Sequence, residues 1–149
     1  MHSKYGWSAS ALLLALSGFL LIGVGCYFLF VRPPLLPEDI RYMSLTPAEL
    51  ESIGPRLARW LAHVFHVMGG YVTATGVLAL TLAATAFRQR SAWALAGSVV
   101  AGLASIGWMA TVNFMINSDF KWVLLGFALT WAASIAAFAM EARRAKHRA

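Results

Sequence analysis

The sequence contains little charge and a single cysteine. Charged residues make up 12% of the 149 residues, about half of the ~25% typical of soluble domains, which excludes an ordinary soluble domain. The lone Cys26 excludes an internal disulfide and any Cys-x-x-Cys zinc or redox site. Low-complexity sequence and a clear internal repeat are also absent, which argues against a disordered protein and against the inverted repeats of secondary transporters.

Long apolar runs take the place of the missing charge. Hydrophobic residues make up 60% of the chain and gather in four runs. Each run matches or approaches the ~20 residues that a helix needs to cross ~30 Å of hydrocarbon. The sequence therefore predicts an all-α integral membrane four-helix bundle, a single transmembrane domain over residues 1–149. The first run is expected to be a span, because a signal-peptide core has only about 7–15 apolar residues. The predicted spans are residues 7–31, 57–87, 92–116 and 120–141.

The basic residues are distributed unevenly between the two sides of such a bundle. With four spans, both chain ends and the turn at 88–91 lie on the same side of the membrane. That side holds seven of the twelve lysines and arginines and one acidic residue. The other side holds five basic residues and five acids. By the positive-inside rule, the N- and C-termini are predicted to be cytoplasmic. The formal net charge of +6 then suits anionic lipid headgroups, and no nucleic-acid partner is expected.

One long connection, residues 32–55, joins the first two spans and is predicted to be extracytoplasmic. Its early prolines, up to Pro37, are expected to end the first helix and impose an extended segment. Thr46 and Glu49 then form a capping-box pattern that begins a new helix. This helix is expected to stop before Pro55. The result is a short interfacial helix that lies flat over the outer end of the bundle, on lipid or as a lid.

Small residues at helical spacing predict where the spans approach one another. Lipid tails are as apolar as the spans, so helices in a membrane associate through close packing, which small residues permit. The predicted contact residues are Gly18 and Gly25 on the first span, Gly69, Gly70, Thr73 and Gly76 on the second, and Gly97, Ala101 and Ser105 on the third.

The second predicted span carries a polar stripe at its outer end. On a helical wheel the residues of this stripe fall within an arc of roughly 100°. The stripe is predicted to face the bundle interior or a water-filled cavity, because a charged residue facing lipid costs about 2.5–3.5 kcal/mol near the bilayer centre. Arg88 is expected at the inner end of this span, and the hydrocarbon region covers ~20 residues before it. The two histidines of the stripe are therefore predicted to lie at the level of the outer lipid headgroups. The stripe consists of Arg56, Arg59, His63, His66, Gly70, Thr73 and Val77.

Polar residues of the third span and acids of the long connection are expected at the same level, which would form an outer-face polar vestibule. Its cationic side chains could hold a lipid phosphate or a small acidic ligand by charge-assisted hydrogen bonds. The alternative is structural, with the two arginines paired to Glu49, Glu51 or Asp119 so that they fix the lid. The candidate ligand-binding residues are Arg56, Arg59, His63, His66, Asn113, Asn117 and Asp119.

His63 and His66 are weak candidates for metal ligands. They lie three residues apart on one helix face. However, they supply two ligands where catalytic zinc usually takes three, and no His-Glu-x-x-His motif accompanies them. A haem with two axial histidines would need a further histidine on another span, and the sequence has none there. No cofactor and no catalytic residue are therefore expected.

Five short stretches, taken in order along the chain, resemble a known group: Phe30-Val31-Arg32-Pro33, Arg59-Trp60, Val67-Met68-Gly69-Gly70-Tyr71, Thr75-Gly76 and Glu141-Ala142-Arg143-Arg144. In this arrangement the chain resembles small bacterial four-helix membrane proteins that are distantly similar to the DoxX-like group. The resemblance covers most of the chain and implies a four-helix bundle in the bacterial inner (plasma) membrane. Some DoxX-like proteins are associated with quinone-linked sulfur oxidation, but this sequence carries no catalytic signature of that role.

These patterns favour a non-enzymatic membrane protein, an accessory or oligomerising component whose vestibule binds a lipid or a small amphipathic ligand. One alternative is a quinone-linked redox or lipid-modifying enzyme that uses His63 and His66. A second alternative is a small dimeric transporter, although few polar residues continue along the spans below Thr73. The expected partners are membrane lipids and either further copies of the chain or a larger membrane complex.

Overall fold

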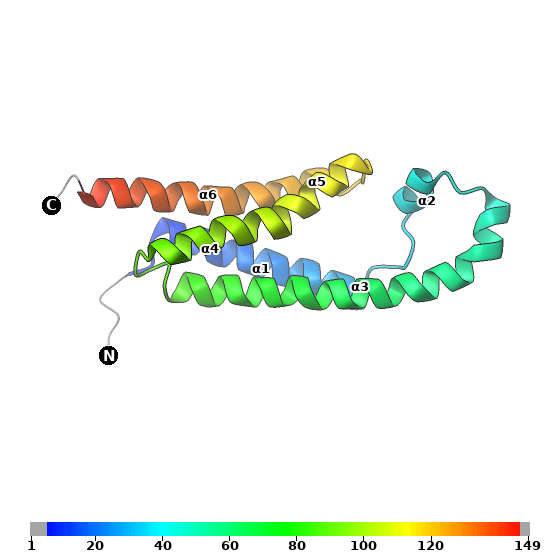
Figure 1. Cartoon of the computed structure of the whole chain (residues 1–149), viewed down its shortest axis with the longest axis horizontal. Coiled ribbons are helices and arrows are strands. Elements are labelled where there is room, and N and C mark those ends of the chain that lie inside the picture. Colours follow the sequence, from blue (N-terminus) through cyan, green and yellow to red (C-terminus); the bar gives the residue numbers. More distant parts are fainter. Residues whose placement is uncertain (1–5, 147–149) are drawn as a thin grey trace.

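The computed structural model describes residues 6–146, and this part of the chain consists of helices joined by turns and loops, without strands. Two layers make up the molecule (Figure 1): α1 lies beside α3, and α4, η1 and α5, which run on as one helix, lie beside α6. The elements are α1 (Ala9–Phe30), α2 (Pro37–Met43), α3 (Pro47–Ala84), α4 (Ala92–Gly102), η1 (Leu103–Gly107), α5 (Trp108–Met115) and α6 (Lys121–Lys146).

Four helical stretches are long and apolar enough to cross a membrane, which supports a multi-pass membrane protein. Tryptophans mark their ends: Trp7, Trp60, Trp93 and Trp122 are all exposed. An amphipathic indole ring favours the membrane interface, which suits these positions. The stretches are Ala9–Phe30, Gly54–Ala84, Ala92–Met115 and Lys121–Ala145.

Glycines bring α1 and α3 into backbone contact. A Cβ atom added to Gly18 would lie 2.8 Å from the carbonyl oxygen of Gly76, and one added to Gly25 would lie 2.8 Å from that of Gly69. Only glycine allows two helices to approach this closely. The small-residue prediction is therefore confirmed for the first two spans, except at Gly70, which is exposed and has open space around it.

The small-residue prediction for the third span is wrong by one residue along the helix. The residues that face a neighbour are Ala94, Ser98 and Gly102, not Gly97, Ala101 and Ser105. Gly102 leaves room for the indole of Trp131 on α6, which is 3% exposed. The Trp131 Nε1–H donates a hydrogen bond of 2.9 Å to the Ser98 carbonyl. One large buried ring thus sets the contact face of α4.

The third span contains a single π-turn, η1, between α4 and α5. A π-turn holds one residue more than an α-helical turn, so the residues after it are rotated by roughly 100° relative to an unbroken helix. A helical wheel with a constant step cannot anticipate this rotation. The π-turn therefore decides which residues of α5 face α1 and α3.

The connection between the first two spans differs from the prediction in two ways. The capping box at Thr46 and Glu49 is present, but the helix that it begins does not stop before Pro55. It continues as α3 to Ala84, with Pro55 inside it. Proline removes one backbone hydrogen bond and bends a helix without necessarily ending it, and Figure 1 shows α3 curving near its start.

The separate short helix is instead α2, which begins at Pro37, in the segment expected to be extended. Proline is well suited to the first position of a helix because its missing N–H would have no partner there. The Leu36 N–H donates to Asp39 Oδ2 at 2.9 Å, which completes the cap. The helix ends at Met43 and is capped by Ser44, whose φ of 55° is left-handed.

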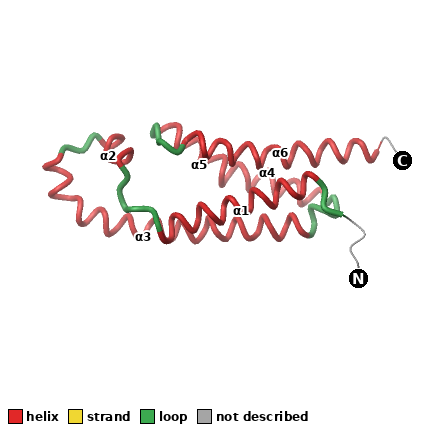
Figure 2. Tube along the Cα trace, turned by 180° about the vertical axis from the view of Figure 1, so that it is seen from behind, coloured by secondary structure: helices red, strands yellow, loops and turns green. Residues whose placement is uncertain are grey.

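The two layers are tightly joined at the closed end of the bundle, where α1 begins and α6 ends (Figure 2). There the ring of Phe87 is fully buried, with its centroid 4.6 Å from that of Phe138. Glu141 accepts hydrogen bonds from Ser10 Oγ at 2.7 Å and from Arg90 Nη1 at 2.5 Å. These contacts link α6 to α1 and to the turn after α3. Toward the opposite end, where α2 lies, the layers diverge in both views.

Candidate functional site

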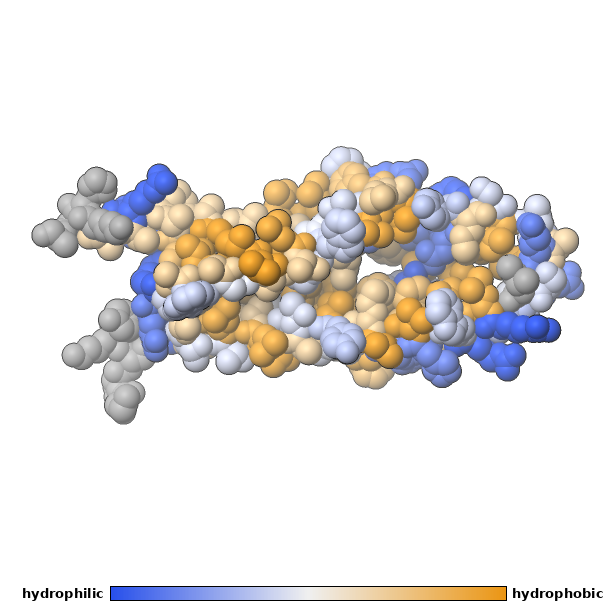
Figure 3. Space-filling view, viewed as in Figure 1, coloured by the Kyte–Doolittle hydropathy of each residue, from blue (hydrophilic) through white to orange (hydrophobic). Residues whose placement is uncertain are grey.

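A cleft of about 1080 Å³ lies between the two diverging layers. In the space-filling view an opening separates the layers, with hydrophobic residues around it and hydrophilic residues gathered at the α2 end (Figure 3). The walls are almost wholly aliphatic and aromatic and come from all four spans. Residues of the walls include Phe19, Val24 and Phe28 of α1, Phe65, Met68 and Val72 of α3, Trp108, Met109 and Val112 of α5, and Leu124 and Phe127 of α6.

The α2 end of the cleft is polar, and Arg32 is its first charged group. Its side chain is 7% exposed and its Nη2 lies 2.9 Å from Asp39 Oδ2, in an ion pair with a side chain that is 20% exposed. Arg32 follows directly after α1, and Nη1 donates to the carbonyls of Pro33 at 2.9 Å and Pro34 at 3.4 Å. The turn after α1 therefore folds around this guanidinium.

Two aromatic rings hold the guanidinium of Arg32 from the other side. Its Cζ atom lies 3.6 Å from the ring centroid of Phe65 on α3 and 5.5 Å from that of Phe28 on α1. A cation over an aromatic face is attracted by the ring quadrupole, the more so where water is excluded. Arg32 thus fixes the junction of α1, α2 and α3.

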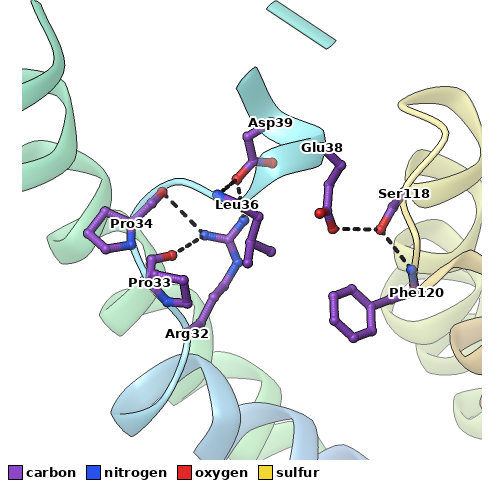
Figure 4. Close-up of polar contacts among 8 residues, drawn as sticks. All are labelled: Arg32, Pro33, Pro34, Leu36, Glu38, Asp39, Ser118 and Phe120. Atoms are coloured by element: carbon purple, nitrogen blue, oxygen red, sulfur yellow. Dashed lines mark hydrogen bonds and ion pairs between the residues drawn. The ribbon is translucent and has the colours of Figure 1, made fainter. Parts of the chain in front are cut away.

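Glu38 is the second charged group at this end, and it is 3% exposed. Ser118, in the turn between α5 and α6, donates a hydrogen bond from Oγ to Glu38 Oε1 at 3.2 Å. The same Ser118 Oγ accepts a bond from the N–H of Phe120 at 3.1 Å. Figure 4 shows the Glu38 carboxylate pointing from α2 toward Ser118, with Arg32 on the other side of Leu36. Within residues 6–146, Glu38 takes part in none of the ion pairs.

The polar stripe of α3 does not line this cleft. Arg56, Arg59, His63 and His66 are all exposed, and the α3 residues that face the cleft lie on another arc. Nε of Arg59 donates to the carbonyl of Pro55 at 3.3 Å, and Nδ1 of His66 lies 2.5 Å from the carbonyl oxygen of Ala62. The prediction that the stripe faces the bundle interior is therefore wrong.

The contact with α1 explains the actual direction of the stripe. The face of α3 that packs on α1 is the one with Gly69, Thr73 and Gly76. Moreover, the first part of α3 extends past the end of α1 (Figure 1), where a charged side chain has no need to turn inward. Of the predicted stripe, only Thr73 lies at a helix contact, with Gly25.

The structure separates the other predicted site residues. Asn113 lines the cleft, and its Nδ2 donates to the carbonyl of Met109 at 2.9 Å. Asn117 and Asp119 are exposed at the turn between α5 and α6. The carboxylate of Asp119 pairs with Arg41 of α2 at 3.2 Å. The side-chain oxygen of Asn117 accepts a hydrogen bond from Nζ of Lys121.

The predicted pairing of Arg56 and Arg59 with acids does not occur in the described chain. The ion pairs there involve Arg32, Arg41 and Arg90, while Glu49 accepts hydrogen bonds from Thr46. Among the described residues 6–146, no three His, Cys, Asp or Glu side chains come together in a group that could hold a metal ion. His63 and His66 therefore lie side by side on α3 without a third ligand nearby.

Sequence reasoning did not single out four of the polar residues that line the cleft, all of them at its α2 end. Arg32 and Asp39 stand close in sequence, but Glu38 and Ser118 are 80 positions apart. The sequence does indicate α2, because a proline followed directly by two acidic residues is typical of the first turn of a helix. The residues missed are Arg32, Glu38, Asp39 and Ser118.

Comparison with protein-family models, with curated proteins and with solved structures finds no match to this chain.

Proposed function

We propose that this multi-pass protein binds a membrane lipid, or a similarly amphipathic molecule, in the cleft between its two layers, and serves as a non-enzymatic accessory or oligomerising component. The observation that supports this is the cleft of about 1080 Å³ with apolar walls and a charged end. Ligand sites are typically concave and mostly apolar, with few polar groups that orient the ligand. A ligand in the cleft would not touch His63 or His66, which lie outside its walls.

The shape of the cleft favours a molecule with a chain and a head. The apolar walls extend along α1 from Phe19 to Phe28, a rise of ~14 Å at ~1.5 Å per residue. The charged residues of the cleft, Arg32, Glu38 and Asp39, lie only at one end of this length. An apolar chain would therefore lie along the helices, with its polar head beneath α2.

We further propose that the protein lies in the inner membrane of a bacterium, with the closed end in the cytoplasm and α2 at the outer interface. The excess of basic residues on the side of the chain ends supports this orientation. A fluorescent protein that matures only in the cytoplasm, fused after Ala149, should be bright. A dark fusion, with an active periplasmic reporter at the same position, would reverse the orientation.

The lipid proposal can be tested by filling the cleft at Gly23. This residue lines the cleft, and a Cβ added to it meets no atom within 4 Å, so a larger side chain enters open space. Gly23→Phe should lower the amount of copurified lipid, measured by native mass spectrometry, by about tenfold. A tenfold loss of affinity is ~1.4 kcal/mol, which corresponds to ~55 Å² of buried apolar surface. A phenyl ring in the cleft would displace more lipid contact area than this.

Gly97→Phe provides the matched control. Gly97 also has no atom within 4 Å of an added Cβ, but it lies on α4 outside the cleft. The control variant should retain as much lipid as the wild type. If the wild type carries no lipid, or if both variants retain it equally, the cleft is not the binding site.

A further inference from the structure

We infer that the cleft selects a ligand whose head is a protonated amine, as in phosphatidylethanolamine, and that the carboxylate of Glu38 binds this ammonium group. The inference rests on the proposed lipid-binding function and adds the chemical class of the head. Three observations carry it: the position of Glu38, the charge balance around it, and the hydrogen bonds already made by its neighbours.

The position of Glu38 is at the polar end of the cleft. Glu38 is 3% exposed, lines the cleft and projects from α2 toward Ser118 (Figure 4). Its hydrogen bond within the described chain comes from a neutral hydroxyl and reaches only Oε1. A carboxylate taken out of water costs free energy unless charged or donating partners compensate it. The protein supplies one weak partner, which leaves capacity for a donor from the ligand.

The charges of the residues that line the cleft, Arg32, Glu38 and Asp39, have a negative sum. The charges of Arg32 and Asp39 compensate each other in an ion pair of 2.9 Å, so Glu38 contributes the uncompensated charge. The nearby Arg41 is paired with Asp119 and exposed. The ammonium group of a zwitterionic head compensates the charge of Glu38 locally, whereas a purely anionic head brings only a second negative charge beside Glu38.

Arg32 is already engaged and therefore does not make the site an anion site. Its Nη1 donates to two backbone carbonyls and its Nη2 to Asp39. Its face is stacked on Phe65. An anionic group that approached this guanidinium would also meet the carboxylate of Asp39, which already compensates its charge. An ammonium group donating to Glu38 leaves the contacts of Arg32 in place and forms a charge-assisted hydrogen bond.

The test compares two lipids that have identical acyl chains and different heads. Purified full-length protein in detergent is mixed with equimolar phosphatidylethanolamine and phosphatidylglycerol, and the bound lipids are counted by native mass spectrometry. Wild-type protein should favour phosphatidylethanolamine by about tenfold, since hydrogen bonds to charged groups have this strength. Glu38→Gln, which keeps the shape and can still accept the bond from Ser118, should bind both lipids equally.

Glu51→Gln is the matched control, because Glu51 is an exposed acid of the same region, and it should keep the wild-type preference. If the wild type binds both lipids equally, or if Glu38→Gln keeps the preference, the assignment of Glu38 is wrong while lipid binding stands. If the wild type binds neither lipid, the proposed function itself fails. Preference for phosphatidylglycerol would also overturn the inference.

Discussion

The contact between α1 and α3 leads to a sharp prediction at Gly76. A Cβ atom added to Gly76 would lie 2.6 Å from the carbonyl oxygen of Gly18 and 2.9 Å from the backbone nitrogen of Ile22. Both atoms belong to the backbone of α1 and cannot rotate away. Gly76→Ala must therefore push the two helices apart.

The magnitude follows from this overlap. Ordinary van der Waals contact for a Cβ begins near 3.4 Å, so the added methyl group overlaps the Gly18 oxygen by about 0.8 Å. Overpacking of this kind costs about 1–3 kcal/mol. Alanine also stabilises a helix by about 1 kcal/mol relative to glycine. Because this gain in helix propensity partly offsets the overpacking cost, the overpacking cost is obtained by comparison with a second glycine-to-alanine variant.

Gly70→Ala provides that comparison. Gly70 lies on the same helix and has no atom within 4 Å of an added Cβ. The two variants share the gain in helix propensity, so the difference between their free energies of unfolding should be the overpacking cost of about 1–3 kcal/mol. Unfolding in detergent with increasing sodium dodecyl sulfate, followed by far-UV circular dichroism, measures it. If Gly76→Ala unfolds at the same point as Gly70→Ala, the close approach of α1 and α3 is not real.

Two further predictions concern single hydrogen-bonded groups. Trp131→Phe removes the indole N–H bonded to the Ser98 carbonyl and should lower the free energy of unfolding by about 1–2 kcal/mol. Trp122→Phe, at an exposed ring, should change it little. If both variants unfold alike, the indole bond contributes nothing measurable. The pKa of Glu49 lies below its usual 4.5, because the backbone N–H and then the hydroxyl of Thr46 donate to its carboxylate. A depressed pKa in the folded state means that the cap is fully formed above pH 4.5 and is lost as the pH falls through the lowered pKa. Amide exchange in the first turn of α3 should accelerate over that range, and Glu49→Gln, which removes the titrating group, should abolish the pH dependence.

The four spans were predictable because their signal is local. An apolar run such as Ala9–Phe30 needs no partner to be recognised, since its length and composition decide it. The capping box at Thr46 and Glu49 is also local and was predicted correctly. The glycine contacts of α1 were predictable for a similar reason, because only close packing explains small residues spaced along a membrane helix.

The direction of the polar stripe could not be predicted in the same way. A helical wheel shows which residues share a face, but not which face a neighbour covers. The arc that contained His63 and His66 also contained Thr73, and only Thr73 contacts α1. The first part of α3 lies past the end of α1 (Figure 1), so α1 covers no face of α3 there.

The candidate site depends on contacts between distant parts of the chain. Glu38 reaches Ser118 across 80 positions, and the π-turn in the third span sets the direction of Trp108 and the residues after it. Neither follows from local pattern. The sequence therefore predicted polar residues at the end of the bundle where α2 lies, with Asn113 among those that line the cleft, but it did not predict the contacts of Arg32, Glu38, Asp39 and Ser118 there.

The position of α2 determines how a molecule can reach the cleft. This helix is tied to the end of α1 through Asp39 and to the turn before α6 through Glu38 and Arg41. A molecule arriving from water would have to break these bonds. The sides of the cleft are different, because Phe19, Tyr71 and Trp108 line it and are also exposed on the flank of the bundle. For the lipid proposed above, the open route is therefore from the side, and the concentration that governs its occupancy would be its mole fraction within the bilayer.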